Sequence, residues 1–144
     1  MITLIKGDLF ASACQALTNP VNCEGVMGKG LAKVFKERWP SMYKEYQNAC
    51  ASGDLRIGKP ILWKGPDKWV VNFPTKESWH HPSKIEYIEQ GLWALASNLK
   101  EWGIASLALP ALGCGLGGLE WAEVKKRIMS LLGNESIPIE VYEP

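Results

Sequence analysis

Two glycine-rich segments carry the clearest chemical signal in the sequence. Residues 25–30 read GVMGKG and residues 113–118 read GCGLGG, and each lies between an expected strand and the start of an expected helix. Glycine lets backbone N–H groups turn toward a ligand without an intervening side chain. The free N–H groups of a helix N-terminus favour anions. Two such loops at equivalent positions indicate a phosphate ligand, and a diphosphate if both face one cleft.

Neither loop matches a well-known nucleotide-binding fingerprint. The GKGL sequence at residues 28–31 lacks the GxxxxGK[ST] spacing of a P-loop. Residues 113–118 are only a loose form of GxGxxG, without the strand–helix–strand unit that normally starts with it. Glycines that merely make a tight connection are therefore the alternative for either loop taken alone.

Three polar residues follow expected strands, at the places where ligand clefts of α/β sheets open. Asp8 and Asn22 are also typical turn residues, whose side chains bond to nearby backbone, so both interpretations stay open. Lys76 follows NFPT at residues 72–75, at the end of an apolar strand. A lysine taken alone is usually a solvated surface charge, but this one is a candidate for the cleft.

The elements that would position these residues alternate along the chain. Apolar, β-branched runs predict strands, and apolar residues at helical spacing predict helices. The expected strands cover residues 2–6, 16–21, 61–63, 69–73, 106–109 and 137–142, and the expected helices cover residues 31–38, 41–52, 85–102 and 121–132. This alternation predicts a three-layer α/β/α sandwich with about six strands. The turn at residues 65–67 predicts an antiparallel hairpin, which makes the sheet mixed.

Local signals also predict where several elements begin and end. Ser41 is expected to cap the second helix through its side chain. The sequence SKIE at residues 83–86 fits a capping box for the third helix. Residues 74–76 are expected to end the strand that begins at Trp69.

Length and charge limit the classes of function. The 144 residues predict a single domain, residues 1–144, and 47% hydrophobic with 22% charged residues excludes wholesale disorder. Sixteen basic residues against fifteen acidic ones leave a net charge of +1, which argues against non-specific binding of a polyanion. The basic residues at positions 29, 33, 36 and 38 are accordingly interpreted as a solvated helix face, with a track for DNA as the less favoured alternative. Any nucleic acid must be recognised locally.

Disulfides, metals and membrane segments are not expected. The four cysteines, at positions 14, 23, 50 and 114, form no CxxC pair, and the only histidines are the adjacent His80 and His81. No stretch approaches the roughly 20 apolar residues of a membrane span, and the first 30 residues lack a signal-peptide layout. We expect a reduced, cytoplasmic protein without a metal or other cofactor.

Five motifs in order along the chain resemble those of macrodomains. They are KGDLF at 6–10, VNC at 21–23, GVMGKGLA at 25–32, NFPTK at 72–76 and LPALGCG at 109–115. The sequence is most similar to the branch of DNA ADP-ribosyl glycohydrolase antitoxins (DarG), with the terminal ADP-ribose protein glycohydrolases as relatives. The resemblance covers essentially the whole chain. It implies a mixed six-stranded sheet between helices, an ADP-ribose cleft, and hydrolysis of an ADP-ribosyl bond.

The resemblance also implies which residues bind ADP-ribose. Asp8 would accept a hydrogen bond from the adenine amino group, with Leu9 beside it, because a carboxylate suits an amine donor. Asn22 would lie near the distal ribose, and Tyr142 would flank the adenosine half. The two glycine loops would surround the phosphates and the distal ribose. The complete expected set is Asp8, Leu9, Asn22, Val26, Met27, Gly28, Gly30, Leu31, Thr75, Pro110, Leu112, Gly113, Cys114, Gly115, Leu116, Gly117 and Tyr142.

Lys76 matches the catalytic lysine of the resembled family. In the glycohydrolases that lysine attacks the anomeric carbon of the distal ribose, which requires a neutral amine. Desolvation in the cleft would lower its pKa and supply the free base. A charged Lys76 would instead stabilise negative charge that develops on the leaving base. The sequence leaves both roles open.

One departure from the pattern of the protein-directed relatives bears on the substrate. They carry a catalytic aspartate where this chain has Gly117, and the DNA-directed branch also has glycine there. The resemblance thus favours ADP-ribosyl thymine over an ADP-ribosylated protein carboxylate. Glu120 is expected at the first turn of the last helix, and Glu24 is a weaker acid–base candidate. The two-carboxylate arrangement of ordinary glycosidases is not evident.

The seven tryptophans raise the alternative of base stacking on single-stranded nucleic acid. Those at positions 63, 69, 93, 102 and 121 fall on expected strands or helix stripes and are assigned to the core. Trp79 lies in the loop just past Lys76, so Trp79 and His80 are candidate contacts to the modified base. An ordinary exposed loop is the alternative.

The sequence therefore predicts a hydrolase that removes ADP-ribose from thymine bases of single-stranded DNA and opposes a DNA ADP-ribosyltransferase toxin. The expected partners are ADP-ribose, ADP-ribosylated single-stranded DNA and the cognate toxin, with the protein acting as a monomer away from membranes. One alternative is a module that binds ADP-ribose without turnover. Others are a deacylase of ADP-ribosylated protein and an ADP-ribose-1″-phosphate phosphatase.

Overall fold

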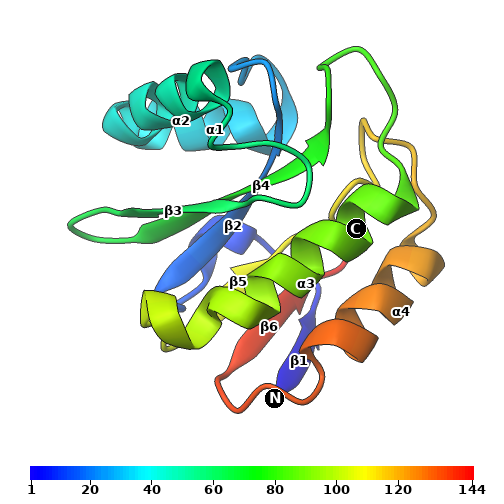
Figure 1. Cartoon of the computed structure of the whole chain (residues 1–144). Helices are drawn as coiled ribbons and strands as arrows, with labels where there is room; N and C mark the ends of the chain where they lie inside the picture. Colours follow the sequence, from blue (N-terminus) through cyan, green and yellow to red (C-terminus); the bar gives the residue numbers. More distant parts are fainter.

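All six expected strands and all four expected helices are present in the computed structural model, which describes residues 1–144 (Figure 1). The sheet order is β1-β6-β5-β2-β4-β3, and every neighbouring pair is parallel except β3 with β4. The elements are β1 (Ile2–Ile5), a 3-10 helix (Leu9–Ala11), β2 (Ala16–Asn22), α1 (Gly30–Arg38), α2 (Pro40–Ser52), β3 (Ile61–Lys64), β4 (Trp69–Lys76), α3 (Ile85–Trp102), β5 (Leu107–Leu109), α4 (Trp121–Leu132) and β6 (Ile139–Tyr142). The mixed sheet and its hairpin are confirmed.

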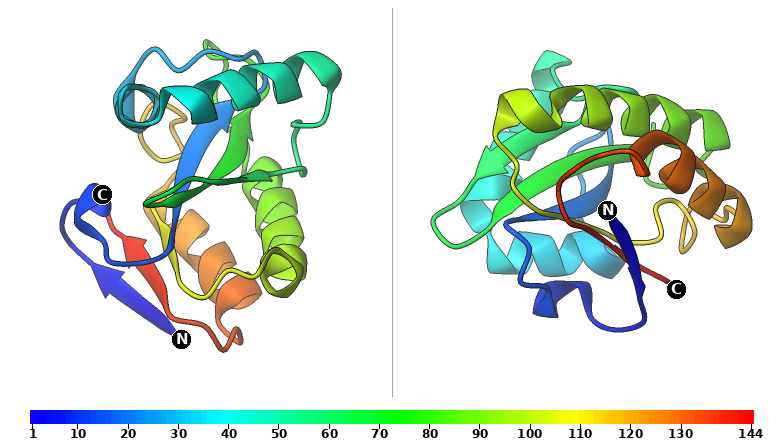
Figure 2. Two further views of the ribbon diagram at one scale, coloured as in Figure 1. Left: turned by 90° about the vertical axis from the view of Figure 1, so that its left-hand side faces the viewer. Right: turned by 90° about the horizontal axis from the view of Figure 1, so that it is seen from below.

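The helices cover the two faces of the sheet in pairs. Helices α1 and α2 pack on one face and α3 and α4 on the other, with the sheet between them (Figure 2). Alternation along β4 divides the core, because Val70 faces α1 and α2 while Val71 and Phe73 face α3 and α4. The three-layer α/β/α sandwich is therefore confirmed. No helix is long and apolar enough to cross a membrane.

The parallel strands end at one edge of the sheet. Strands β1, β6, β5, β2 and β4 all point the same way, so the residues at their carboxyl ends line up along that edge. These residues are Asp8, Tyr142, Pro110, Asn22 and Lys76, in the order of the strands. Ligands of open α/β sheets bind beyond such an edge.

Strand β4 is longer than the sequence predicts. It continues through Pro74 and Thr75 to Lys76, instead of ending at Phe73. Strand β3 pairs with β4 only as far as Asn72, so beyond that residue β4 has a neighbour on one side only. A proline without an N–H is tolerated at such an edge. Lys76 is consequently held by the sheet and not by a loop.

Two predicted side-chain caps do not form. Trp39 is the N-cap of α2, with Pro40 as the first helical residue, so Ser41 is already inside the helix. The fixed φ of proline suits that first position. Lys84, and not Ser83, is the N-cap of α3, and it has no side-chain cap bond. The Ser83 N–H donates instead to the Gly117 carbonyl oxygen at 3.0 Å, which holds Ser83 against the second glycine loop.

Helix α3 packs closely on β4 where Gly91 lies over the ring of Phe73, and a substitution at Gly91 tests this packing. A Cβ added to Gly91 would lie 2.2 Å from Cζ of Phe73. We expect Gly91→Ala to lower the melting temperature, because overpacking costs about 1–3 kcal/mol and the gain in helix propensity is about 1 kcal/mol. Thermal unfolding measures the change. Ser97→Ala, on the exposed face of the same helix, is the control and should melt near the wild type. A Gly91→Ala variant that melts at or above the wild-type temperature would contradict the described packing.

Candidate functional site

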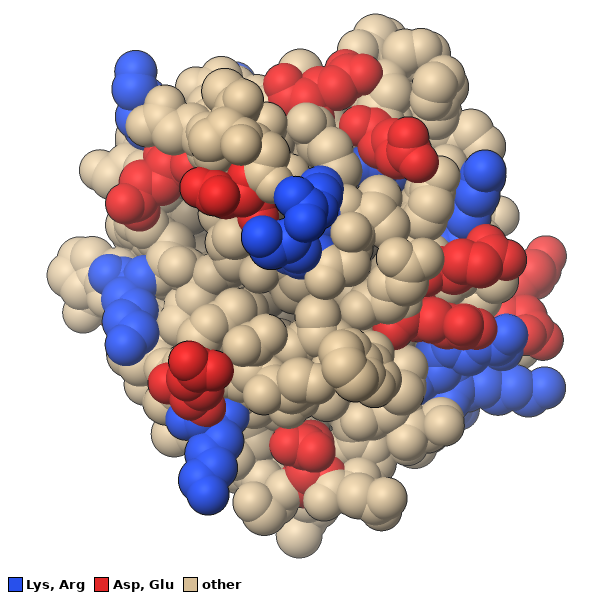
Figure 3. Space-filling view, viewed as in Figure 1, with Lys and Arg blue, Asp and Glu red and all other residues tan.

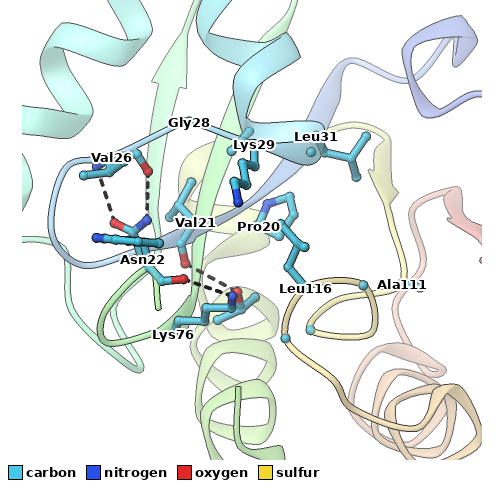
Figure 4. Close-up of a pocket in the computed structure, with 17 residues that line it drawn as sticks. Pro20, Val21, Asn22, Val26, Gly28, Lys29, Leu31, Lys76, Ala111 and Leu116 are labelled. Atoms are coloured by element: carbon cyan, nitrogen blue, oxygen red, sulfur yellow. Dashed lines mark hydrogen bonds between the residues drawn. The ribbon is translucent and has the colours of Figure 1, made fainter. Parts of the chain in front are cut away.

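A cavity of about 540 Å³ lies between the β2–α1 loop, the end of β4 and the β5–α4 loop (Figure 4). Its volume is within the range of small-molecule sites. Both glycine loops contribute to its walls. The residues that line it are Pro20, Val21, Asn22, Val26, Gly28, Lys29, Gly30, Leu31, Ala32, Thr75, Lys76, Trp79, Ala111, Gly113, Gly115, Leu116 and Gly117.

Asn22 shapes the first glycine loop. Its Nδ2 donates to the Val26 carbonyl oxygen at 2.8 Å, and its Oδ1 accepts from the Val26 N–H at 3.4 Å (Figure 4). The same Oδ1 accepts from the Glu24 N–H at 3.0 Å. The buried Tyr46 hydroxyl donates to the same Oδ1 at 2.9 Å. The turn interpretation of Asn22 is therefore confirmed, and its side chain also lines the cavity.

The second glycine loop is packed against the start of α3. Gly113 has φ +74°, a conformation that favours glycine, and its carbonyl oxygen accepts from the Leu119 N–H at 2.9 Å. A Cβ on Gly117 would lie 2.3 Å from Ser83 Oγ. Leu116 is 68% exposed, and its Cδ1 would be 3.8 Å from a Cβ on Gly30. The two loops thus approach each other at Leu116, across the cavity.

Lys76 is half-buried at the end of β4. Its Nζ donates to the Trp79 carbonyl oxygen at 3.4 Å and forms no ion pair. Burial lowers the pKa of Lys76 below the ordinary 10.5, because desolvation penalises the ammonium form. The cavity lining contains Lys29 and Lys76 and no carboxylate. An anion is therefore favoured in it, and the lowered pKa makes the neutral amine of Lys76 more accessible than that of an exposed lysine.

The candidate carboxylates lie outside the cavity. Glu24 and Glu120 are absent from its lining. Glu120 occupies the N-cap of α4, as expected, but its side chain makes no capping bond. No group of three metal-ligating side chains comes together in the structure.

The structure brings most, but not all, of the predicted binding residues to the cavity. Met27 and Leu112, which belong to the two loop regions, are buried, and Leu9 is the buried residue of the 3-10 helix. The Cys114 Sγ contacts the Leu112 carbonyl oxygen at 3.6 Å. The predicted residues outside the cavity lining are Asp8, Leu9, Met27, Pro110, Leu112, Cys114 and Tyr142, together with His80.

Asp8 and Tyr142 lie farther along the same sheet edge. Asp8 caps the 3-10 helix by accepting from the Phe10 N–H at 2.9 Å through Oδ1, and its Oδ2 has no partner in the protein. Tyr142 is largely buried, and its hydroxyl donates to Glu140 Oε1 at 2.8 Å. Asp8 therefore retains an acceptor atom, whereas the Tyr142 hydroxyl is already used.

The loop after Lys76 presents an aromatic side chain at the cavity. Trp79 lines the cavity and is 54% exposed. The ring of His80 lies edge-on to it, with 5.2 Å between the centroids, and Ser78 Oγ lies 2.8 Å from His80 Nδ1. The assignment of Trp93 to the core is wrong, since it is 67% exposed on α3. The buried stripe of α3 runs through Ile88, Leu92, Leu95 and Leu99, and Trp93 lies outside it.

Lys29 is the most informative residue that the predicted binding set omits. Lys29 is exposed, as the solvated-face interpretation predicts, and it also lines the cavity. Its place between two glycines is the signal that could have identified it, because no neighbouring side chain separates it from a ligand. The cavity lining also includes four residues whose sequence surroundings do not mark them as part of a site: Pro20, Val21, Ala32 and Ala111.

Comparisons with known proteins agree with this architecture. Residues 18–128 match the family model described as Macro domain. A Thermus aquaticus protein named DNA ADP-ribosyl glycohydrolase is 44% identical over 149 residues, covering 100% of this chain and 41% of its own length. A Thermosipho africanus protein named DNA ADP-ribosyl transferase-DNA ADP-ribosyl glycohydrolase fusion protein is 41% identical, with 99% and 42% covered. This chain thus spans about two fifths of the length of these curated relatives.

A solved structure is also similar over the whole fold. The structure titled "Thermosipho africanus DarTG in complex with ADP-ribose" superposes with a TM-score of 0.96 at 43% identity, covering 99% of this chain and 41% of that one. By its title, that protein binds ADP-ribose.

Proposed function

The chain belongs to the macrodomain family, and from that premise we propose that it is an ADP-ribosyl glycohydrolase acting on ADP-ribosylated thymine in single-stranded DNA. The observation that carries the proposal is the cavity lined by two glycine loops and two lysines without a carboxylate. The printed names of the relatives support the same activity.

Binding follows from the walls of the cavity. The backbone N–H groups of the two loops hold the diphosphate, and the lack of acidic side chains in the lining avoids repulsion. The distal ribose lies between Asn22 and Lys76, next to the loops. The adenine extends along the sheet edge toward Asp8, whose free Oδ2 accepts from the amino group.

Lys76 carries the chemistry in this proposal. Its neutral Nζ attacks the anomeric carbon of the distal ribose, and the bond from that carbon to the thymine nitrogen breaks. The electron pair leaves with the base, whose ring nitrogen is flanked by two carbonyl groups that spread the negative charge, and this nitrogen then takes up the proton that the attacking amine loses. Water then hydrolyses the enzyme-bound sugar, releasing ADP-ribose and restoring the amine. In the alternative role, a charged Lys76 stabilises the departing base electrostatically.

The biological role that we propose is that of an antitoxin. The similarity to a protein named as a fusion of a DNA ADP-ribosyl transferase with a glycohydrolase supports a toxin of that class as the opposing enzyme. We also propose that the protein acts as a monomer.

A substrate comparison tests the proposal. The protein is incubated with an oligonucleotide ADP-ribosylated on thymine, a protein ADP-ribosylated on carboxylates, and ADP-ribose-1″-phosphate, while calorimetry measures free ADP-ribose binding. We expect release of ADP-ribose from the oligonucleotide and little turnover of the other two. Binding without any turnover would instead identify a recognition module. Preferred release from protein, or of phosphate, would replace the proposed substrate.

Trp79 should contribute to binding of the DNA. Stacking of a base on an aromatic side chain contributes about 1–3 kcal/mol, so Trp79→Ala should weaken binding of the ADP-ribosylated oligonucleotide roughly 5- to 150-fold. Fluorescence anisotropy of a labelled oligonucleotide gives the affinity. Trp93→Ala is the matched control, since Trp93 is also exposed but lies on the outer face of α3. Equal effects of the two substitutions would refute a role for Trp79 in stacking.

A further inference from the structure

Lys29 is a cation of the cavity that no group of the protein neutralises. It is the N-cap of α1, with φ −145° and ψ 162°, and its side chain makes no capping bond. The ion pairs of the structure all lie elsewhere, among Glu89, Glu123, Lys126 and Arg127. In Figure 4 the side chain runs from the start of α1 into the cavity, on the side where Lys76 lies.

This position is unfavourable for a lysine in the free protein. Serine, threonine, aspartate and asparagine are the preferred N-caps, because their side chains bond to free N–H groups of the first turn. A positive charge there also opposes the positive end of the helix dipole. The first turn of α1 contains no acidic residue to compensate it. A residue that opposes the local preferences of a helix N-terminus and also lines a cavity is typical of a functional site. The group that would compensate the charge of Lys29 is an anion.

The surroundings of Lys29 narrow the identity of that anion. Basic and acidic side chains are interleaved over the face of the molecule shown in Figure 3, so no broad positive patch covers that face. The loop N–H groups are available for the diphosphate of ADP-ribose. The Lys29 side chain instead extends toward Lys76, where the proposed reaction cleaves the bond, and the DNA lies beyond that bond.

We infer that Lys29 binds a backbone phosphate of the polynucleotide next to the modified thymine, an inference that rests on the proposed function. Lys29 is then a specificity-determining residue, since it favours a thymine within a DNA strand over the same adduct on a free nucleoside. A single local contact of this kind agrees with a protein whose net charge is only +1. Together with Trp79 it would hold one base and one phosphate at the cavity.

Three substrates and three variants test the inference. Kinetics are measured with the ADP-ribosylated oligonucleotide and with ADP-ribosyl thymidine, which has no flanking phosphate, and calorimetry is performed with free ADP-ribose. Lys29→Gln removes the charge and Lys29→Arg keeps it. Lys33→Gln, one turn along α1, removes an equal charge outside the cavity lining and is the matched control.

We expect Lys29→Gln to raise KM for the oligonucleotide about tenfold, the size of one charge-assisted contact. The slope of log affinity against log salt should become shallower by about 0.7. Turnover of ADP-ribosyl thymidine and affinity for ADP-ribose should stay within about twofold of the wild type, and Lys29→Arg should restore most of the loss. Lys33→Gln should change none of these quantities beyond about twofold.

Two outcomes would overturn the inference. If Lys29→Gln weakens turnover of ADP-ribosyl thymidine or binding of free ADP-ribose as much as it weakens turnover of the oligonucleotide, Lys29 binds the diphosphate instead. If Lys29→Gln leaves KM for the oligonucleotide unchanged, Lys29 does not bind a phosphate of the DNA. If the wild type cleaves neither substrate, the proposed function fails. Anisotropy with the ADP-ribosylated and the unmodified oligonucleotide still tests the Lys29 contact by itself in that case.

Discussion

Lys76→Ala should lower turnover of the ADP-ribosylated oligonucleotide about 10³-fold, within the range of losses that removal of a nucleophile, proton-transfer group or charge-stabilising group produces. The cavity contains no carboxylate that could replace the amine. Affinity for ADP-ribose should change by only a few-fold, because the two glycine loops remain intact. Product release measured by chromatography and binding measured by calorimetry separate the two effects.

The control for this variant is Lys100→Ala, which removes an exposed lysine at the end of α3, away from the cavity. It should retain wild-type turnover. Undiminished turnover by Lys76→Ala would contradict the assigned role of Lys76. A loss of ADP-ribose affinity as large as the loss of turnover would instead give Lys76 a role in binding only.

The pH dependence and Lys76→Arg distinguish the two possible roles of Lys76. Burial lowers its pKa below 10.5, so the neutral fraction at a given pH is larger than for an exposed lysine. If the neutral amine attacks the sugar, kcat/KM rises with pH and levels off at the pKa of Lys76. Arginine stays charged, so Lys76→Arg should then be as inactive as Lys76→Ala. Substantial activity of Lys76→Arg, together with a wild-type rate that falls as Lys76 loses its proton, would identify the electrostatic role.

Gly117→Ala should change the conformation of the second glycine loop so that it no longer binds ADP-ribose well. A Cβ on Gly117 would lie 2.3 Å from Ser83 Oγ and 2.5 Å from the Gly113 carbonyl oxygen, so the loop must move. We expect affinity for ADP-ribose to fall more than about tenfold and stability to fall by about 1–3 kcal/mol, the usual cost of overpacking. Calorimetry and thermal unfolding measure the two losses.

Gly115→Ala is the matched control for the melting temperature, because a Cβ at Gly115 has no protein atom within 4 Å. It should melt like the wild type. Adding Ser83→Gly to Gly117→Ala should recover little of the lost stability or affinity, since the contact of the new Cβ with the Gly113 carbonyl oxygen remains. A Gly117→Ala variant with wild-type melting and wild-type affinity would show that the loop does not need its described conformation.

The close contacts of Gly117 also limit which substrates a variant at this position could cleave. Gly117→Asp would introduce the carboxylate of the protein-directed relatives, but its Cβ meets the same two atoms. We therefore expect this variant to lose activity on DNA without gaining release of ADP-ribose from protein carboxylates. The contacts of Gly117 thus give it a role in the packing of the loop, and its role in the choice of substrate stays a prediction.

Most of the fold could be predicted, because apolar residues and glycine segments recur at regular positions along the sequence. The stripe of Ile88, Leu92, Leu95 and Leu99 predicts the buried face of α3, and the two glycine segments predict loops at strand–helix junctions. The alternation of strands and helices then predicts a three-layer sandwich with a mixed sheet, but not the order of the strands, in which the first strand β1 lies next to the last strand β6. These signals are local and repeat along the chain, so they can be interpreted without coordinates.

The parts that could not be predicted depend on contacts between distant segments. The end of β4 depends on where β3 stops pairing, at Asn72. Ser83 does not cap α3, because its backbone is bonded to Gly117. The direction of the Lys29 side chain depends on the cavity, which the two glycine loops and the end of β4 create. None of these contacts leaves a pattern in the residues around it.

The most direct test of the central claim is a structure of the protein with bound ADP-ribose. We predict that the diphosphate lies on the N–H groups of both glycine loops, and that the Lys76 Nζ lies within about 3.5 Å of the anomeric carbon, the distance of a reactive encounter. An ADP-ribose whose distal ribose lies far from an amine that points into solvent would contradict the account.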